Sequence, residues 1–260
     1  MGKYGLIGGK LGHSFSLGIH EQCFGELEEK STYELIETPS ERLEDTLKRF
    51  ADECYGGINV TIPHKKAVMQ YLDGISPEAE SIGAVNTIKF TDGKLYGYNT
   101  DYDGFGMMLR RFGVDIDGKD VYVLGTGGAS NAVSAYCRNN GAKVTLVSRT
   151  PSENAIDYLE FERVATDGVL INCTPVGMYP DVDSTPTEYV SCFDAVVDVI
   201  YNPTMTKLLS LAENKGIKAV NGLYMLVAQA VRAEEIWHNA KFDEDVVERI
   251  YQETVKKLNS

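Results

Sequence analysis

Three glycines, Gly125, Gly127 and Gly128, stand between an apolar run and a helix-forming segment in VYVLGTGGASNAV. In a strand–turn–helix of this kind the first glycine allows a tight turn, and the second lets the backbone approach a pyrophosphate. The N–H groups that open the helix bind the anion. The pattern predicts a dinucleotide site, with small Ala129 and Ser130 letting the helix lie close to the strand. The alternative is an ordinary strand-to-helix turn.

The end of the next expected strand distinguishes between the two common dinucleotides. An NAD site needs Asp or Glu there, about 20 residues after the glycines, to bind the ribose hydroxyls. This sequence has Ser148, Arg149 and Thr150 instead. A guanidinium suits a 2′-phosphate by its charge and its planar hydrogen bonding. We therefore predict NADP; the alternative for Arg149 is a solvated surface side chain.

Two serines precede the first expected helix. Ser14 and Ser16 stand two residues apart in GHSFS, so both hydroxyls can point the same way just before a helix that begins near Leu17. Two hydroxyls and a helix N-terminus can form a cradle for a carboxylate. The alternative is that one serine only caps the helix.

Other polar side chains stand at the ends of expected strands. Asn59 and Thr61 alternate with apolar residues, so they share one face of a strand that leads to Lys65. A solvent-facing side of a strand has the same pattern. Asn86 interrupts another apolar strand and Asp101 opens a helix, and each also fits a turn or a cap.

The histidines and cysteines carry little signal. The four histidines show none of the spacings of a metal site, so no metal is predicted, and His64 is open as a general base or as a packing residue. The five cysteines are odd in number and form no CxxC pair. Free thiols in a reducing cytoplasm are therefore expected.

The composition excludes some partners. The chain has 38 acidic and 25 basic residues, a net charge of −13, which repels nucleic acid and acidic membranes. We find no run of eighteen apolar residues and no signal peptide. Neither a nucleic acid nor a membrane is an expected partner.

Strand-like runs alternate with helix-length segments along all 260 residues, which predicts an α/β protein with largely parallel sheets. At this length two domains are expected. Strands are expected near residues 3–7, 32–37, 57–62, 84–90, 94–98, 168–172, 195–200 and 217–220. Helices are expected near 17–28, 41–52, 101–112, 206–214, 222–238 and 243–258. The turn Thr91-Asp92-Gly93 predicts a hairpin.

Taken together, these stretches resemble the shikimate dehydrogenase family. The matching segments occur in the family's order and at about its spacing: HSFS, NVTIPHK, GAVNT, GYNTD, GTGGAS, NCTPVGM, DVIYNPTMTKLL and NGLYMLVAQA. The resemblance implies an open N-terminal α/β substrate domain, residues 1–101, completed by helices in residues 223–260. An NADP-binding Rossmann domain, residues 102–222, would be inserted between them.

The resemblance also implies an activity, the reversible NADP-dependent reduction of 3-dehydroshikimate to shikimate on the route to chorismate and the aromatic amino acids. It implies a catalytic pair, Lys65 and Asp101. The implied substrate-binding residues are Ser14, Ser16, Thr61, Asn86, Tyr201 and Gln229. The implied cofactor-binding residues are Gly125, Thr126, Gly127, Gly128, Ala129, Ser148, Arg149, Thr150, Val199 and Gly222.

Elementary chemistry agrees with these roles. Ketone reduction needs a hydride and a proton donor at the carbonyl oxygen, which a lysine ammonium can supply while it stabilises developing negative charge. Gln229 lies on the more apolar side of its helix, where an amide needs polar partners such as a ligand. Asn59 is expected to support its loop and Lys66 to be solvated.

Some residues depart from the family pattern. The phosphate loop carries Glu153 where relatives usually have a second basic residue, so NADP preference can be weaker than is typical. A quinate or dual quinate/shikimate dehydrogenase is the nearest alternative, and a non-catalytic metabolite sensor is the alternative from another class. A small-molecule substrate and a monomer or homodimer are expected.

Overall fold

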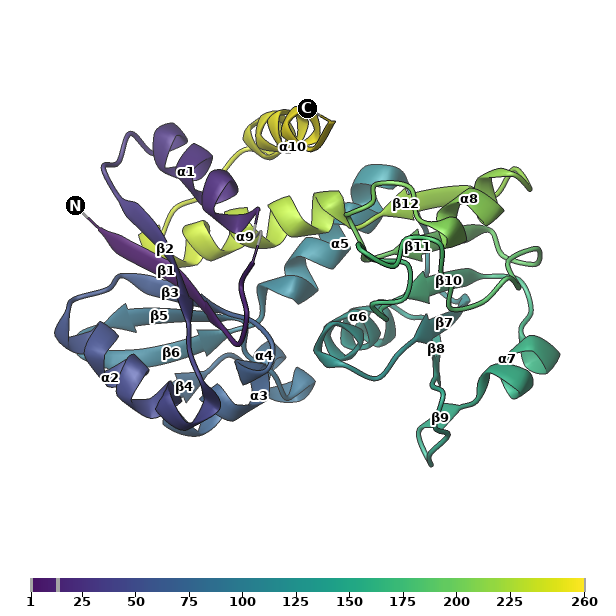
Figure 1. Cartoon of the computed structure of the whole chain (residues 1–260), viewed down its shortest axis with the longest axis horizontal. Coiled ribbons are helices and arrows are strands. Elements are labelled where there is room, and N and C mark those ends of the chain that lie inside the picture. Colours follow the sequence, from purple (N-terminus) through teal and green to yellow (C-terminus); the bar gives the residue numbers. More distant parts are fainter. Residues whose placement is uncertain (1, 13–14, 260) are drawn as a thin grey trace. The chain divides into compact units, whose positions relative to one another are not determined.

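A computed structural model describes residues 2–12 and 15–259. The chain forms two compact units. Unit 1 runs from the N-terminus to Gly104 and resumes at Val227, and unit 2 is Phe105–Leu226. Helices α5 (Thr100–Phe112) and α9 (Leu223–His238) each pass from one unit into the other. The α/β class expected from the sequence is confirmed (Figure 1).

Unit 1 contains a mixed six-stranded sheet with the strand order β2-β1-β3-β5-β6-β4. Its strands are β1 (Lys3–Gly8), β2 (Thr32–Glu37), β3 (Gly57–Val60), β4 (Gly74–Ile75), β5 (Thr87–Thr91) and β6 (Lys94–Tyr98). The predicted hairpin is confirmed, because β5 and β6 pair antiparallel. Asp92 and Gly93 both have positive φ in its turn, as a two-residue hairpin loop requires.

Helices cover both faces of the unit 1 sheet (Figure 1). The helices of unit 1 are α1 (Ser16–Glu26), η1 (Ser40–Arg42), α2 (Leu43–Asp52), α3 (His64–Ala67), η2 (Val68–Tyr71), α4 (Pro77–Ile82), the start of α5, the later part of α9, and α10 (Glu244–Asn259). On one face, Leu43, Leu47 and Phe50 of α2 pack on Ile7 and Ile58. Their spacing along α2 places them on one side of the helix.

The other face of this sheet carries an aromatic cluster. Tyr4, Phe24, Tyr33 and Trp237 pack together from β1, α1, β2 and α9. Helix α10 in turn packs on α1, with Val247 and Ile250 among its buried residues. The last helix thus packs its apolar side within unit 1.

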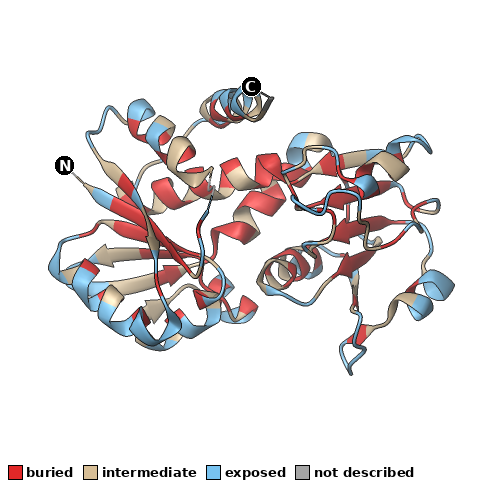
Figure 2. Cartoon of the chain, viewed as in Figure 1, coloured by how far each residue is buried: buried red, intermediate tan, exposed pale blue. Residues whose placement is uncertain are grey.

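Unit 2 is a parallel six-stranded sheet with the order β12-β11-β10-β7-β8-β9. Its strands are β7 (Asp120–Leu124), β8 (Lys143–Val147), β9 (Ala155–Ile156), β10 (Val169–Asn172), β11 (Ala195–Asp198) and β12 (Lys218–Asn221). The helices beside it are α6 (Gly128–Asn139), α7 (Tyr158–Val164) and α8 (Lys207–Glu213). Strands β10 and β11 are buried along their whole length (Figure 2), as expected for strands covered on both faces.

Three strands are at least two residues shorter than the sequence predicts, and one of them is β11, which ends at Asp198 instead of residue 200. β3 ends at Val60 instead of Ile62, and β5 begins at Thr87 instead of residue 84. After Val60 the chain turns, and the His64 amide donates to the Thr61 carbonyl. Lys65 therefore lies on the short helix α3 and not at the tip of a strand. Across residues 2–12 and 15–259, no helix is long and apolar enough to span a membrane.

A glycine in β3 gives a test of the packing. A Cβ added to Gly57 would lie 2.1 Å from Trp237 Nε1, and the indole N–H is fixed by its hydrogen bond to the Ile88 carbonyl. Gly57→Ala is therefore expected to lower the unfolding free energy by about 1–3 kcal/mol through overpacking. Denaturant unfolding followed by the fluorescence of Trp237, the single tryptophan, measures this.

Gly25→Ala is the matched control. Gly25 lies in α1, and a Cβ there would meet no described atom within 4 Å. An alanine is expected to leave stability unchanged or to raise it by about 0.5–1 kcal/mol. Equal losses for the two variants would contradict the packing argument.

Candidate active site

Unit 1 holds a mostly buried ion pair formed by two of the predicted site residues. Lys65 Nζ lies 2.6 Å from Asp101 Oδ2, with the side chains 18% and 12% exposed. Lys65 comes from α3, and Asp101 is the second residue of α5. The helix N-terminus favours the carboxylate through its dipole. Lys66, the next residue, is exposed as expected, whereas Lys65 is mostly buried.

Backbone hydrogen bonds fix Lys65 from several sides. Its carbonyl accepts from the Val85 N–H at 2.8 Å, and the Ile62 carbonyl accepts from Gly9 at 3.0 Å. His64 Nε2 donates to the Thr38 carbonyl at 2.7 Å, since that oxygen can only accept. His64 is 1% exposed. His64 was predicted to be either a general base or a packing residue. The structure favours the packing residue, because the buried ring holds the turn before Lys65.

Asn86 fixes the start of the helix that carries Asp101. Its Oδ1 accepts from the backbone N–H of Thr100 at 2.7 Å, and its Nδ2 donates to Thr100 Oγ1 at 3.1 Å. Thr87 Oγ1 also donates to Asn86 Oδ1. The predicted site residue Asn86 is 3% exposed and is thereby joined to Asp101 through Thr100.

This network extends to residues that the sequence analysis did not assign to the site. Asn59 Nδ2 donates to Thr87 Oγ1 at 3.1 Å, and Asn59 Oδ1 accepts from the Tyr33 hydroxyl at 2.8 Å. All these side chains are buried. Asn59 supports the interior, in agreement with its expected role. The signal for Thr100 was its place directly before a helix, where hydroxyl residues commonly cap.

The remaining predicted substrate residues come from different elements. Ser14 lies outside the described residues, and Ser16 is the first residue of α1. Thr61 follows β3 and is half-buried, and its amide donates to the Ile7 carbonyl. Gln229 is half-buried on α9. Tyr201 belongs to unit 2, where it follows β11, and burial raises the pKa of its phenol.

The glycine turn of unit 2 fits a pyrophosphate. Gly125 has φ +102°, which favours glycine, and its amide donates to the Val147 carbonyl at 2.8 Å. A Cβ on Gly127 would meet no described atom within 4 Å, so the backbone is open to a ligand. Helix α6 begins at Gly128 without a side-chain cap from the described residues. Its first N–H groups are therefore available to an anion.

The predicted adenosine-phosphate residues follow β8. Ser148 Oγ accepts from the Thr150 amide at 3.3 Å, which shapes the turn. Arg149 is exposed on this turn. The structure places the guanidinium beyond the carboxyl end of the second strand of the glycine motif, the position of the residue that contacts the ribose in dinucleotide sites.

The two residues expected against the nicotinamide lie next to each other in unit 2. A Cβ on Gly222 would be only 2.0 Å from the Val199 carbonyl oxygen, so a glycine is required for this approach. The Gly222 amide donates to the Ile200 carbonyl at 3.0 Å. The loops after β11 and β12 are thereby held together.

A buried carboxylate anchors the same loops. Asp198, the last residue of β11, is fully buried. Its Oδ1 accepts from Asn172 Nδ2 and from the Ile200 amide, and its Oδ2 accepts from Thr206 Oγ1 at 2.7 Å. Asn172 in turn accepts from Thr174. Asp198 was not among the predicted site residues, because its local sequence is that of any aspartate at the end of a strand.

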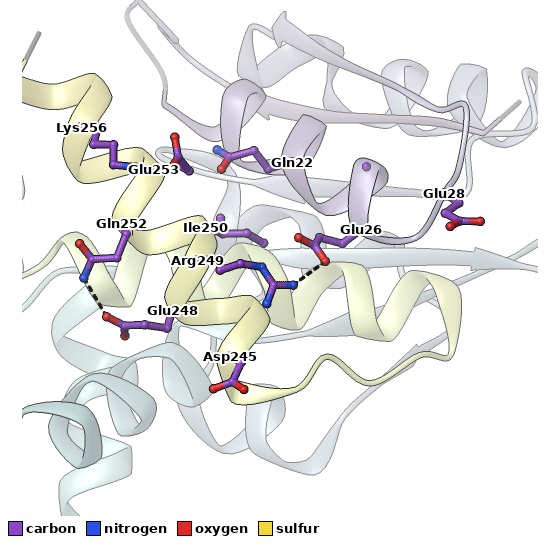
Figure 3. Close-up of a pocket in the computed structure, with 11 residues that line it drawn as sticks. Gln22, Glu26, Glu28, Asp245, Glu248, Arg249, Ile250, Gln252, Glu253 and Lys256 are labelled. Carbon is purple, nitrogen blue, oxygen red and sulfur yellow. Dashed lines mark hydrogen bonds and ion pairs between the residues drawn. The ribbon is translucent and has the colours of Figure 1, made fainter.

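A separate cavity of about 950 Å³ lies between α1 and α10 in unit 1 (Figure 3). Its lining is mostly charged, and Arg249 binds Glu26 across it at 2.9 Å. None of the predicted site residues lines it. The candidate site is therefore the region of Lys65 and Asp101, and not this cavity.

Known proteins similar to this chain share one family. A family model described as the shikimate dehydrogenase substrate binding domain matches residues 6–88. A shikimate dehydrogenase (NADP(+)) of Clostridium perfringens is 44% identical over 265 residues, covering 96% of this chain and 97% of the relative. The crystal structure of a chorismate mutase/shikimate 5-dehydrogenase fusion protein from Clostridium acetobutylicum has a TM-score of 0.97 and 45% identity, covering 100% of this chain and 99% of that chain. A Thermus thermophilus shikimate 5-dehydrogenase, solved with NADP(H) and shikimate, has a TM-score of 0.87 and 34% identity, covering 97% and 99%.

The parallel sheet with its glycine turn, together with a second unit that carries a lysine–carboxylate pair, defines a two-domain α/β oxidoreductase. Within that class the chain belongs to the shikimate dehydrogenase family. The family and fold class predicted from the sequence are thereby confirmed. The roles of the individual residues stay predictions.

Burial raises the pKa of Asp198 to about 6, although hydrogen bonds from Thr206, Ile200 and Asn172 act in the opposite direction. The folded protein therefore binds this proton more tightly than the unfolded chain does. The contribution of Asp198 to the unfolding free energy is largest below about pH 4 and falls by about 3 kcal/mol as the pH rises through about 6. In carboxyl ¹³C NMR, a carboxylate titrating near pH 6 is expected, and it is absent from Asp198→Asn.

Asp194→Asn, at a half-exposed position of the same unit, should leave that resonance in place. If all aspartate carboxyls of the wild type had titrated by about pH 5, the raised pKa would be refuted.

Proposed function

We propose that this protein catalyses the reversible reduction of 3-dehydroshikimate to shikimate with NADPH. The observation that carries the proposal is the mostly buried Lys65–Asp101 ion pair in a chain of this family. It is supported by the 44% identical relative named shikimate dehydrogenase (NADP(+)) and by the similar structure solved with NADP(H) and shikimate.

Lys65 acts as the proton donor in the proposed reaction. Bound NADPH supplies the hydride for the carbonyl carbon. The Lys65 ammonium gives its proton to the ketone oxygen and stabilises the negative charge that develops there. Asp101, 2.6 Å away, orients the ammonium. In the oxidation of shikimate the same amine accepts the hydroxyl proton, and solvent restores the starting state of Lys65.

Polar side chains of unit 1 hold the substrate in this proposal. Ser16, together with Ser14, binds the carboxylate at the start of α1. Thr61, Asn86 and Gln229 bind the carboxylate or the ring hydroxyls. The support for Asn86 is its link to the helix of Asp101. Tyr201 contributes its hydroxyl to substrate binding.

Unit 2 binds NADP in this proposal. The turn from Gly125 to Ala129, including Thr126, holds the pyrophosphate at the start of α6. Ser148, Arg149 and Thr150 bind the adenosine phosphate, and Val199 and Gly222 lie against the nicotinamide. We further propose a cytoplasmic location, supported by five free cysteines, and a monomer or homodimer.

The function is tested by assaying shikimate and quinate, each with NADP and with NAD. Shikimate with NADP is expected to be the best pair. In the same assay Lys65→Ala is expected to lower kcat by about 10²- to 10⁴-fold, the usual contribution of a general acid, with a much smaller change in KM for shikimate.

Lys66→Ala is the control, since Lys66 is exposed, and its kinetics should match the wild type. If the protein oxidised quinate with NAD and did not oxidise shikimate with NADP, both the proposed substrate and the proposed cofactor would be wrong. A variant Lys65→Ala that keeps its kcat and loses only affinity would make Lys65 a binding residue.

Arg149→Gln tests cofactor choice. Loss of the guanidinium removes a charge-assisted contact to the 2′-phosphate, so KM for NADP should rise about tenfold or more, while KM for NAD stays nearly unchanged. Steady-state kinetics with both cofactors measure this. Arg163→Gln, an exposed arginine in the same unit, is the control. Equal effects of Arg149→Gln on both cofactors would rule out the phosphate role.

A further inference from the structure

A chain of four ionisable side chains joins helix α1 to helix α9 inside unit 1. Glu234 of α9 is fully buried, and its Oε1 lies 2.5 Å from His20 Nδ1 of α1. Its other oxygen, Oε2, forms an ion pair with His238 Nε2 at 2.9 Å. His238 Nδ1 continues the chain to Glu29 at 3.2 Å, just beyond α1.

The surroundings of this chain are apolar and aromatic. The His20 ring is also fully buried and stacks on Tyr33, with centroids 4.0 Å apart and an angle of 11° between the planes. Tyr4, Phe24 and Trp237 pack around the same place. Other titratable groups that act on the chain are Cys23 and the phenols of Tyr4 and Tyr33, whose pKa values burial and Glu234 both raise.

The carboxylate of Glu234 is kept ionised by its two histidines. Burial alone raises the pKa of Glu234, but the hydrogen bonds and charges of His20 and His238 outweigh it and leave the pKa below its usual value. Burial lowers the pKa of His238, while Glu234 and Glu29 raise it overall. Each group is thus stabilised by the others, and removal of one leaves a buried charge without compensation.

The two helices joined in this way both carry proposed substrate-binding residues. Ser16 is the first residue of α1, and His20 follows it by four residues, on the same side of the helix. Gln229 lies five residues before Glu234 on α9. An apolar pair of similar volume would hold α1 on α9 at least as strongly as this polar pair. What the hydrogen bond between His20 and Glu234 adds is direction and a fixed length, which determine how α1 is rotated and shifted along α9.

We propose that Glu234 and His20 are positioning residues, whose buried hydrogen bond sets the register of α1 against α9 and so the geometry with which Ser16 and Gln229 meet the substrate. The inference rests on the proposed function, because Ser16 and Gln229 are assigned there. It concerns substrate binding only. The proton transfer by Lys65 and the NADP site of unit 2 do not depend on it.

Glu234→Gln tests this inference by kinetics. It keeps the volume and one acceptor oxygen but removes the charge. KM for shikimate is expected to rise about tenfold, with kcat and KM for NADP within about twofold of the wild type. Glu26→Gln is the matched control, because Glu26 of α1 pairs with Arg249 of α10 at a partly exposed site. It should leave all three constants unchanged.

A double variant separates positioning from stability. His20→Leu with Glu234→Leu replaces the hydrogen-bonded pair by an apolar pair, which is expected to fold with a thermal midpoint at least equal to that of Glu234→Gln. If the hydrogen bond positions α1, this double variant keeps the raised KM for shikimate. If it restores both the midpoint and the wild-type KM, the pair serves only packing and the inference is overturned.

The remaining outcomes are also decisive. An unchanged KM for shikimate in Glu234→Gln overturns the inference. If Glu234→Gln does not fold, the KM of the double variant for shikimate decides whether the pair positions α1 or serves only packing. A wild-type protein that does not oxidise shikimate refutes the proposed function, whereas an active wild type with unaffected variants refutes only the positioning role.

Discussion

The ion pair between Lys65 and Asp101 is the interaction on which the arrangement of unit 1 depends. Both charges are largely removed from water, and either one alone would carry a desolvation cost of several kcal/mol. The fold must therefore bring Lys65 and Asp101, which are 36 residues apart in the sequence, into contact. On the lysine side this is done by backbone hydrogen bonds around α3. On the aspartate side it is done by side chains, because the start of a helix has N–H groups that need acceptors.

Those side chains explain why the interior of unit 1 contains so many polar groups. Asn86 Oδ1 accepts from the amide of Thr100 and from Thr87 Oγ1, and Thr87 Oγ1 in turn accepts from Asn59 Nδ2. Every side chain in this network is buried and hydrogen-bonded. The network is therefore rigid, and its burial does not carry the desolvation cost of unpaired polar groups. An apolar core would pack equally well against the strands, but it would not fix the point at which α5 begins.

Sequence patterns predicted what depends on local periodicity and on ordered motifs. The amphipathic helices, the Asp92-Gly93 hairpin and the glycine turn all follow from neighbouring residues. Contacts between distant segments could not be predicted in this way. His20 and Glu234 are 214 residues apart, and Glu234 reads locally as one more polar residue in RAEEIWH. Lys65 was expected at a strand tip because alternation in NVTI resembles a strand, whereas the turn at Thr61 depends on hydrogen bonds to β1 and within the turn.

Unit 2 also has to hold its functional loops in one conformation, and it does so with a different set of residues. In a parallel sheet the loops at the carboxyl ends of the strands form the ligand site, yet the strands themselves do not determine where those loops go. Asp198 ties the loop after β11 to β10 and to the start of α8, and the contact of Gly222 with Val199 sets the distance to the next loop. A buried carboxylate can accept several hydrogen bonds at once, whereas an apolar side chain accepts none. In both units, then, buried polar side chains, Asn86 in unit 1 and Asp198 in unit 2, lie where the backbone needs acceptors to hold a functional loop or helix start in one conformation.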